Sequence, residues 1–494
     1  MSDRDTNKKR QVGNVQYVDV DKEYLHKRQL KRKASWVLLW GLGVGAVISG
    51  DYFGWNFGLL AGGFWGLTLA TALMAAMYLC MVYSIAELTT ALPHAGGFYS
   101  FTRNAFGPWG GFLVGMSDTI EYIITPAVIV AGIGGYLNAL FPAIPLSLWW
   151  LMAYAIFVGI NIRGVEITLK VGMVATLVSI AVLLIFYAGA IVSGAFQWGL
   201  LFNVPAEAGQ SETFLPKGWL GVFAAIPYAI WFYLAIEELP LAAEETVDVV
   251  TAMPRAMILG VFTLFALSVG TMVLNSGVGG GAAAIGASQA PLNDGFAAIF
   301  GEGATTVLLT LVALTGLIAS FHTIIYAYGR VLFALSRAGY LPRWISVTSE
   351  RFKTPHLALL IGGAAGLITA VLLDLFGKGT VGAALLNMAV FGAVISYAAV
   401  MVSFIRLRIK RPDMPRPYRS PLGIPGAATG TILAVVALFA CFANSEYRPG
   451  VYGVAIFLFL SLLYFAFYSR HRLVAQAPEE EVALMAGAQK ELVH

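Results

Sequence analysis

Long apolar runs alternate with short polar segments along almost the whole of this 494-residue chain. Each run is long enough to cross a hydrocarbon core of about 30 Å as an α-helix. The pattern therefore predicts an all-α integral membrane protein with twelve transmembrane helices. Their expected ranges are 35–62, 64–92, 108–139, 147–163, 168–194, 219–247, 254–278, 303–338, 356–377, 381–409, 426–444 and 449–470.

The composition supports a membrane protein. Hydrophobic residues make up 58% of the chain and charged residues 12%, whereas about 25% of residues are charged in a soluble domain. The two cysteines, Cys80 and Cys441, lie in apolar runs, so we expect free thiols and no disulfide framework. We expect a cytoplasmic N-terminal arm (1–33), a twelve-helix membrane domain (34–472) and a loosely ordered cytoplasmic tail (473–494).

Lysine and arginine are distributed very unevenly between the expected loops. One side of the membrane carries 28 of the 31, and the other carries only Lys217, Lys378 and Arg448. Because cytoplasmic loops are enriched in these residues, both termini are predicted to be cytoplasmic. We expect a multi-pass protein with the lipid bilayer as partner and no nucleic acid; the resemblance given below implies the bacterial cytoplasmic (inner) membrane. The pattern indicates no particular oligomeric state.

The first and sixth spans contain residues that disfavour a continuous helix. Residues 41–54 include five glycines and Asp51, and the sixth span includes Pro227, Glu237 and Pro240. Each glycine costs about 1 kcal/mol of helix propensity, and an ionised group near mid-membrane costs about 2.5 kcal/mol or more. A broken helix that lines a cavity explains both costs. Close helix packing is an alternative explanation for the glycines but not for the carboxylates.

The two irregular spans lie five helices apart, which is typical of a five-plus-five inverted repeat with a binding site at the broken helices. The expected units are repeat one at about 35–194, repeat two at about 219–409, and two extra helices at about 426–470.

Four motifs in order carry a family resemblance: they lie at 86–99, 243–255, 336–342 and 411–419. The chain resembles the amino acid-polyamine-organocation superfamily of transporters from about Ser35 to Arg472. Within it, three segments are most similar to the bacterial ethanolamine permease branch: 50–58, 120–128 and 320–330. The resemblance implies a secondary active transporter (permease) that works by alternating access.

Other functional classes fit less well. The sequence has no spaced His and Asp metal cluster, no Gly-x-Ser-x-Gly elbow and no nucleotide-binding loop, so we expect no enzyme, no metal and no cofactor. A channel is disfavoured because paired broken helices suit alternating access around one central site.

One departure from the superfamily pattern bears on the substrate. Where amino acid carriers that resemble this chain have a Gly-Ser-Gly turn that holds a carboxylate, this chain has Ser49-Gly50-Asp51. A carboxylate side chain there should attract an ammonium by about 4 kcal/mol at 4 Å and an effective dielectric of 20. We therefore predict import of ethanolamine or a closely related small organic amine. The alternative is an amino acid permease of the same superfamily.

Candidate substrate-binding residues lie at or near the expected breaks. Aromatic rings are included because an ammonium gains about 0.5 to 2 kcal/mol over a π face. For Asp51 the alternative is a helix cap, and for the aromatics it is packing. The candidates are Asp51, Ser49, Gly50, Tyr52, Glu121, Trp231, Tyr233, Glu237 and Ser320.

Candidates for proton or ion coupling are Glu121, Asp118, Ser179, Thr323 and His322. Asp118 and Glu121 share a helix face by their i,i+3 spacing. Ser179 stands where proton-coupled members that resemble this chain carry a lysine, so lysine-based coupling is unsupported. A co-transported proton, a co-transported sodium ion and uniport remain open, and His322 has a structural alternative as a hydrogen-bonded histidine.

Charged residues near the inner ends of the spans are predicted to form ion pairs that close a cytoplasmic gate. The alternative is simple topology, with long side chains that reach the interface. The gate candidates are Glu87, Glu244, Glu245, Arg255 and Arg330, together with Arg103 and Arg337. We assign no chemistry to the acidic cluster at 479–481 in the tail.

Overall fold

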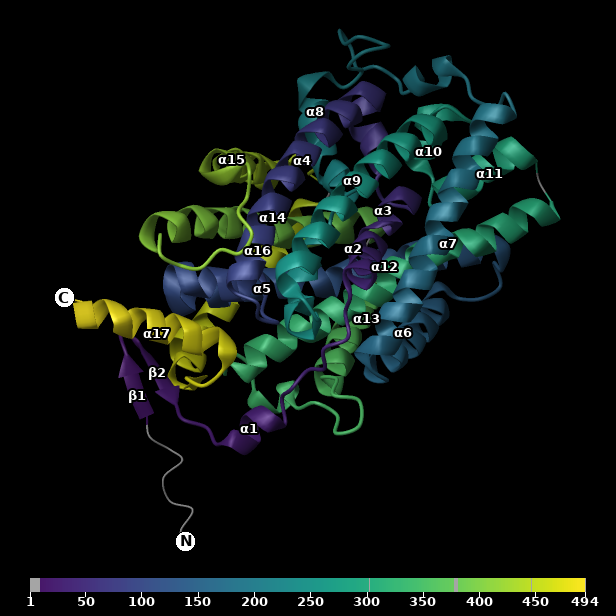
Figure 1. Ribbon diagram of the computed structural model, residues 1–494. Helices are drawn as coiled ribbons and strands as arrows, with labels where there is room; N and C mark the ends of the chain where they lie inside the picture. Colours follow the sequence, from purple (N-terminus) through teal and green to yellow (C-terminus); the bar gives the residue numbers. More distant parts are fainter. Residues whose placement is uncertain (1–8, 302, 377–380, 446, 494) are drawn as a thin grey trace.

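The computed structural model describes residues 9–301, 303–376, 381–445 and 447–493. Most of these residues are helical, and the long helices pack side by side into one bundle (Figure 1). Lys378, one of the three cations predicted on the outer side, lies outside the described residues.

Helices form both the bundle and parts of its loops, and the label η marks a 3-10 helix. In chain order they are α1 (Lys22–His26), α2 (Trp36–Val47), α3 (Ser49–Tyr52), α4 (Phe57–Ala91), α5 (Phe98–Leu140), α6 (Leu146–Ile162), α7 (Val165–Val192), η1 (Trp198–Phe202), α8 (Gly218–Trp231), η2 (Ile236–Glu245), α9 (Val249–Ser276), α10 (Gly281–Ala287), α11 (Pro291–Phe300), α12 (Ala304–Arg337), η3 (Arg343–Ser346), α13 (His356–Phe376), α14 (Val381–Lys410), α15 (Gly423–Ala440), α16 (Arg448–Phe467), η4 (Ser469–His471) and α17 (Pro478–Val493).

Within the described ranges, nine helical segments are long and apolar enough to cross a membrane. Three shorter apolar helices accompany them, at Trp36–Asp51, Leu146–Ile162 and His356–Leu372. Each of the twelve predicted spans overlaps one of these segments. The membrane-spanning, mostly helical character is thus confirmed, whereas the count of twelve and the inverted repeat stay predictions.

Two glycines mark boundaries that the sequence predicted. Gly63 has a φ of 72° and a ψ of 176° inside α4, between the predicted spans 35–62 and 64–92. Gly107 has a φ of 80° inside α5, directly before the predicted start at 108. Only glycine adopts such backbone angles at little cost. A Cβ at Gly63 would also lie 2.4 Å from the Pro216 ring.

The interruption of the first span lies later than its glycines indicated. The helix continues through the glycine-rich run to Tyr52, with a tightened turn at Ile48, and breaks only at residues 53–56. The glycines instead permit close packing: a Cβ would meet the Met173 side chain at 2.4 Å from Gly41, and the Trp231 carbonyl oxygen at 2.3 Å from Gly50. The predicted break is therefore present but was placed too early.

The predicted interruption of the sixth span is confirmed. Helix α8 ends at Trp231, and η2 begins at Ile236 after a non-helical stretch that ends with Ala235 at a φ of 87°. Such a φ is costly for a residue with a Cβ. The Glu237 carboxylate stabilises it by accepting the Ala235 N–H at 2.9 Å. Because Gly50 packs on the Trp231 carbonyl, the two interrupted spans touch each other.

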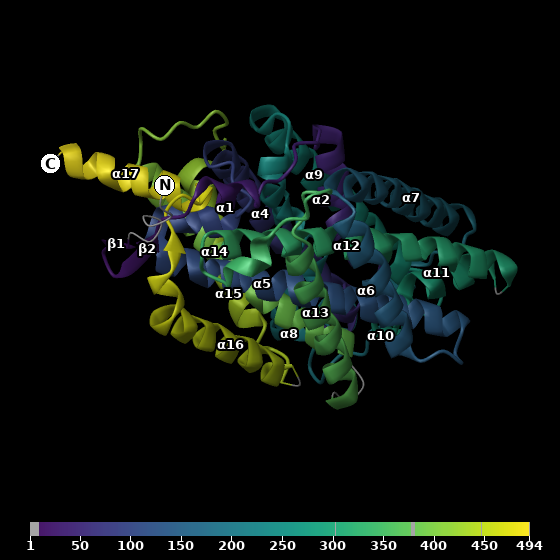
Figure 2. The ribbon, with the colours of Figure 1, turned by 90° about the horizontal axis from the view of Figure 1, so that it is seen from below.

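The two terminal segments lie side by side. Strand β1 (Lys9–Val12) pairs antiparallel with β2 (Val15–Val18), and β2 pairs parallel with β3 (Leu473–Val474). Figures 1 and 2 both show the small sheet beside α17 at one end of the bundle. Both segments therefore lie on the same side of the bundle, as an even number of crossings requires.

The expectation of a loosely ordered tail was wrong. Residues 473–474 are a strand and 478–493 a helix, and the side chains of Glu479 and Glu480 are fully buried. Buried carboxylates need partners, and these partners come from distant parts of the chain that no local pattern could reveal.

Candidate functional site

Asp51 lies on α3, one residue before the end of the helix and two before the interruption, and it is completely buried. Among the described residues, no side chain or backbone group makes a hydrogen bond of good geometry to either of its carboxyl oxygens. The Thr271 hydroxyl on α9 lies within reach as a hydrogen-bond donor, and Tyr187 on α7 is close enough to interact with Asp51 electrostatically. The helix-cap alternative does not hold, because Asp51 accepts no described backbone N–H, and α4 begins at Phe57 with Asn56 in the N-cap position.

Ser320 holds the turn that precedes Asp51. Its hydroxyl donates to the Gly45 carbonyl oxygen at 2.7 Å and accepts the Ser49 N–H at 2.9 Å. Helix α12 thereby stabilises the irregular turn between α2 and α3. The geometry supports a positioning role for Ser320, and it places Ser49 and Gly50 between α12 and the broken sixth span.

The three aromatic residues among the substrate-binding candidates, Tyr52, Trp231 and Tyr233, differ in their hydrogen bonds. The Tyr52 hydroxyl donates to the Ser179 carbonyl oxygen at 2.7 Å, so it is already engaged with α7. Tyr233 interacts electrostatically with Asp51, and its hydroxyl is 3.0 Å from the Ser268 hydroxyl. The Trp231 indole N–H has no described partner, and a Cβ at Gly54 would lie 2.7 Å from its nitrogen.

Glu121 and Glu237 form an acidic cluster that Tyr78 and Tyr397 link to Tyr233. The Tyr397 hydroxyl on α14 lies within hydrogen-bonding distance of the carboxylates of Glu121 (3.2 Å) and Glu237, and it can donate its single proton to either of them. The Tyr78 hydroxyl donates to that of Tyr397 at 3.1 Å. The Tyr78 ring also packs 5.5 Å from the Tyr233 ring, so a chain of aromatic side chains connects this cluster with the surroundings of Asp51.

Four buried carboxylates near the interrupted helices have no cationic partner in the part of the chain that the structure describes. Asp118, Glu121, Glu237 and Glu238 are 0–1% exposed, and each has at least one oxygen without a described hydrogen-bond partner. None of the described ion pairs includes these residues or Asp51. An uncompensated buried charge costs several kcal/mol, so each site must hold a proton or receive a cation.

The remaining coupling candidates are hydrogen-bonded within the bundle. His322 lies 3.0 Å from the Thr168 carbonyl oxygen through Nε2 and 3.1 Å from the Asn161 amide nitrogen through Nδ1. This geometry favours its structural alternative. Ser179 and Thr323 donate to helix carbonyl oxygens one turn earlier, at 2.6 and 2.9 Å.

Most of the gate candidates form ion pairs. Arg330 binds Glu245 at 2.8 Å, and both are at most 1% exposed. Arg337 binds Glu244 at 2.5 Å. The prediction of ion pairs is confirmed for these four residues, while their gating role stays a prediction.

Glu87 and Arg255 differ from the other gate candidates. Glu87 binds two arginines that were not gate candidates: Arg408, in the last turn of α14, at 2.5 Å, and Arg416, in the loop after α14, at 3.1 Å. Arg255 forms no ion pair among the described residues and lies 4.0 Å above the Trp36 ring instead.

Sequence reasoning missed several residues of the site. Tyr187, Thr271, Tyr78 and Tyr397 belong to no motif, and aromatic or hydroxyl residues in apolar runs are usually packing residues. The one available signal was the helical spacing that places Tyr187 two turns after Ser179 on α7. Tyr397 lies 276 residues from Glu121, so its role depends on tertiary packing alone.

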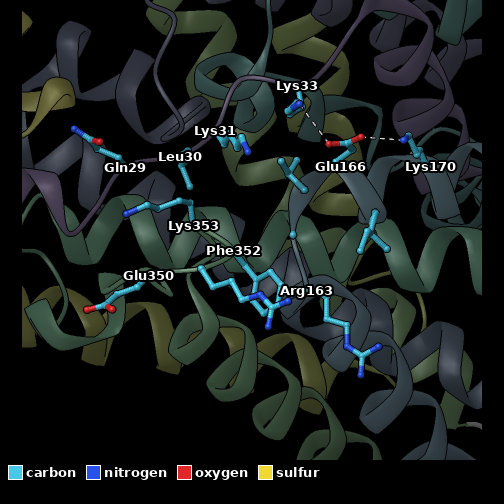
Figure 3. A pocket seen from close by; sticks show the side chains of 14 residues that line it. Gln29, Leu30, Lys31, Lys33, Arg163, Glu166, Lys170, Glu350, Phe352 and Lys353 are labelled. Atoms are coloured by element: carbon cyan, nitrogen blue, oxygen red, sulfur yellow. Dashed lines mark hydrogen bonds and ion pairs between the residues drawn. The ribbon is translucent and has the colours of Figure 1, made fainter.

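An open pocket lies away from the buried carboxylates. It has a volume of about 570 Å3 and is lined by the N-terminal arm, the start of α7 and the loop before α13. Lys33 and Lys170 point toward Glu166 there (Figure 3). Since Asp51, Glu121 and Glu237 have almost no exposed surface, the central site is occluded from solvent.

Comparison with known proteins gives a consistent picture. A sequence model of the family described as amino acid permease matches residues 35–468. The branched-chain amino acid permease of Bacillus subtilis is 25% identical, over 90% of this chain and 94% of that protein. The methylthioribose transporter of the same organism is 24% identical, over 90% and 95%. L-asparagine permease 1 of Mycobacterium tuberculosis is 25% identical, over 82% and 83%.

Proposed function

Because the chain belongs to the amino acid permease family and is thus a multi-pass membrane transporter, we propose that its solute is a small organic amine, such as ethanolamine. The ammonium group of the solute binds the Asp51 carboxylate. The observation that carries it is the fully buried Asp51 carboxylate, which forms no ion pair among the described residues. An ammonium would supply the missing charge, and the Tyr233 ring nearby would add a cation–π contact.

A second candidate is an amino acid, and the names of two relatives favour it, since they specify branched-chain amino acids and asparagine. An amino acid also has an ammonium that Asp51 could bind. It differs in its carboxylate, which Asp51 would repel by about 4 kcal/mol if the two charges lay 4 Å apart at an effective dielectric of 20. The two candidates therefore differ in one chemical group.

For coupling, we propose that Glu121 and Glu237 carry a proton. They share the Tyr397 hydroxyl and have no described cation beside them. Two buried carboxylates this close repel each other when both are ionised, so one of them is expected to hold a proton. Release of this proton to the cytoplasm would couple amine import to the proton gradient across a bacterial inner membrane.

Uptake of radiolabelled ethanolamine into proteoliposomes tests the substrate. Proton, sodium and voltage gradients are imposed one at a time, and unlabelled alanine, leucine and ethanolamine are added as competitors. We expect saturable uptake that ethanolamine blocks and alanine does not. Competition by the amino acids with no ethanolamine uptake would establish the second candidate, and linear unsaturated flux would contradict a carrier.

The Glu121→Gln variant tests the proton site. Glutamine keeps the acceptor for the Tyr397 hydroxyl but cannot release a proton. We expect uptake to lose its response to an imposed pH gradient while its response to voltage stays. An unchanged pH profile would remove Glu121 as the proton carrier. Glu166→Gln, on the exposed start of α7, is the matched control.

A further inference from the structure

The C-terminal residues 473–481, termed the tail segment, are docked against the ends of several helices. The Val474 N–H donates to the Ala338 carbonyl oxygen at 2.9 Å, directly after α12. A Cβ at Gly339 would lie 2.4 Å from the Arg472 carbonyl oxygen, so the backbones are in direct contact. Gln476 adds hydrogen bonds to Asp19 at 2.9 Å and to the Val20 N–H at 3.2 Å, which tie the tail segment to the N-terminal arm.

Glu480 occupies a pocket of hydrogen-bond donors. The Arg103 guanidinium on α5 binds its carboxylate at 2.7 Å. The hydroxyls of Tyr17 and Tyr340 each donate to it at 2.8 Å, and that of Tyr99 donates at 3.3 Å. These donors come from the N-terminal arm, from α5 and from the loop after α12. One carboxylate thus joins three separate parts of the chain.

Glu479 joins an ion pair of the predicted gate. It binds Arg337 at 2.6 Å, and the same guanidinium binds Glu244 at 2.5 Å. The Glu244 carboxylate also accepts the Ala95 N–H at 3.0 Å. Arg337 ends α12, Glu244 lies in the second half of the broken sixth span, and Ala95 precedes α5. A cleft of about 410 Å3 adjoins this junction, lined in part by Arg28, His94 and Pro478.

We propose that the tail segment is an autoinhibitory latch, which holds the inner side of the permease closed and must undock before that side opens. A solute at Asp51 reaches the cytoplasm only if the ends of α2, η2, α5 and α12 separate. The tail segment is bonded to α5 and α12 directly, to η2 through Arg337, and to α2 through the arm. Separation of these ends therefore breaks its contacts.

The burial of two carboxylates makes this docking reversible. Burial raises the pKa of Glu479, and the Arg337 guanidinium 2.6 Å away acts in the opposite direction. Undocking returns both carboxylates to water and so recovers much of the desolvation cost. Docked and undocked states of such a segment can therefore differ little in free energy, as a switch requires.

The test measures opening of the inner side and needs no known solute. Ala242 lies on η2, fully buried, two residues before Glu244. In a background with Cys80 and Cys441 replaced by alanine, Ala242→Cys is labelled in detergent with a water-soluble maleimide. Loss of two charge-assisted contacts in the E479Q/E480Q double variant should speed labelling about tenfold. The neighbouring Glu481 is exposed, so E481Q should label at the parent rate.

A reversible cross-link gives a second measurement that keeps all the ion pairs. Val18 and Val474 are paired residues of β2 and β3, close enough for a disulfide between cysteines. Oxidation of the V18C/V474C variant should slow labelling of Ala242→Cys below the reduced rate, and reduction should restore it. Equal rates in both redox states, or equal labelling of E479Q/E480Q and E481Q in samples that elute as folded protein, would overturn the latch.

Discussion

The buried carboxylates fall into two regions that differ in a single respect. Near the interrupted helices, Asp51, Glu121 and Glu237 have no described cationic partner. Toward the end of the bundle where β2 and β3 pair, Glu87, Glu245 and Glu480 are equally buried, and each is bound by at least one arginine. Burial is the same in both regions, and only the partner differs.

This difference separates binding from closure. A buried carboxylate that already has its arginine gains nothing from a solute, so it serves to hold elements together. A buried carboxylate without a partner gains strongly from a cation or a proton that arrives from outside. Counting acidic residues in apolar spans does not distinguish the two kinds, whereas knowing their partners does.

Asp51→Asn, which removes an unpaired carboxylate, should have the largest effect of the substitutions that test this difference. The amide keeps the size of the side chain but removes its charge, so ethanolamine affinity should fall about a thousandfold, from loss of about 4 kcal/mol. Binding is measured by calorimetry on purified protein. Asp294→Asn removes a carboxylate from α11, outside both regions, and should bind normally. Equal affinity in the Asp51 variant would refute amine recognition there.

Arg330→Gln should turn a paired carboxylate into an unpaired one. Glu245 would stay fully buried without its cation, at a cost of about 3 to 5 kcal/mol in the free energy of unfolding. Thermal unfolding in detergent measures the loss. Arg351→Gln, an exposed arginine in the loop before α13, is the control. A variant as stable as its parent would show that the ion pair contributes no net stability.

His94 tests the effect of burial through the pH dependence of stability. Burial lowers the pKa of His94 to about 4, while the unfolded imidazole takes up a proton below about 6.5. The folded state therefore keeps the stability contributed by neutral His94 above pH 6.5 and loses up to about 3 kcal/mol as the pH falls to 4. His94→Asn, which keeps an acceptor near Ser100, should lessen this decline in unfolding scans. A decline as steep as that of the parent would assign the pH sensitivity to other groups.

Lys170→Ala should have the smallest effect. Lys170 binds Glu166 at 2.9 Å, but both side chains are about half exposed or more, so the pair contributes less than about 1 kcal/mol. The same unfolding assay applies. A loss comparable with that of Arg330→Gln would mean that burial is not what distinguishes strong ion pairs in this protein.

Sequence patterns alone determined the membrane class, the approximate span positions and the presence of two interrupted spans. The membrane class and the span positions depend on composition over about 20 neighbouring residues. The span boundaries and interruptions depend on single glycines such as Gly63 and Gly107, or on a short segment such as 235–240, which change the backbone locally. The family resemblance rested on short motifs for the same reason, and the family match at 35–468 confirmed it in its broader form.

Tertiary structure alone decided which carboxylates have partners. The glycines before Asp51 lie within helices and permit close packing, because a Cβ at Gly41 would clash with the Met173 side chain and one at Gly50 with the Trp231 carbonyl oxygen. Glu87 pairs with Arg408, which is 321 residues away in the sequence, and Glu480 pairs with Arg103, which is 377 residues away. Such pairings follow from how the whole chain packs, since the free energy of a buried charge depends on its neighbours in space and not on its neighbours in sequence.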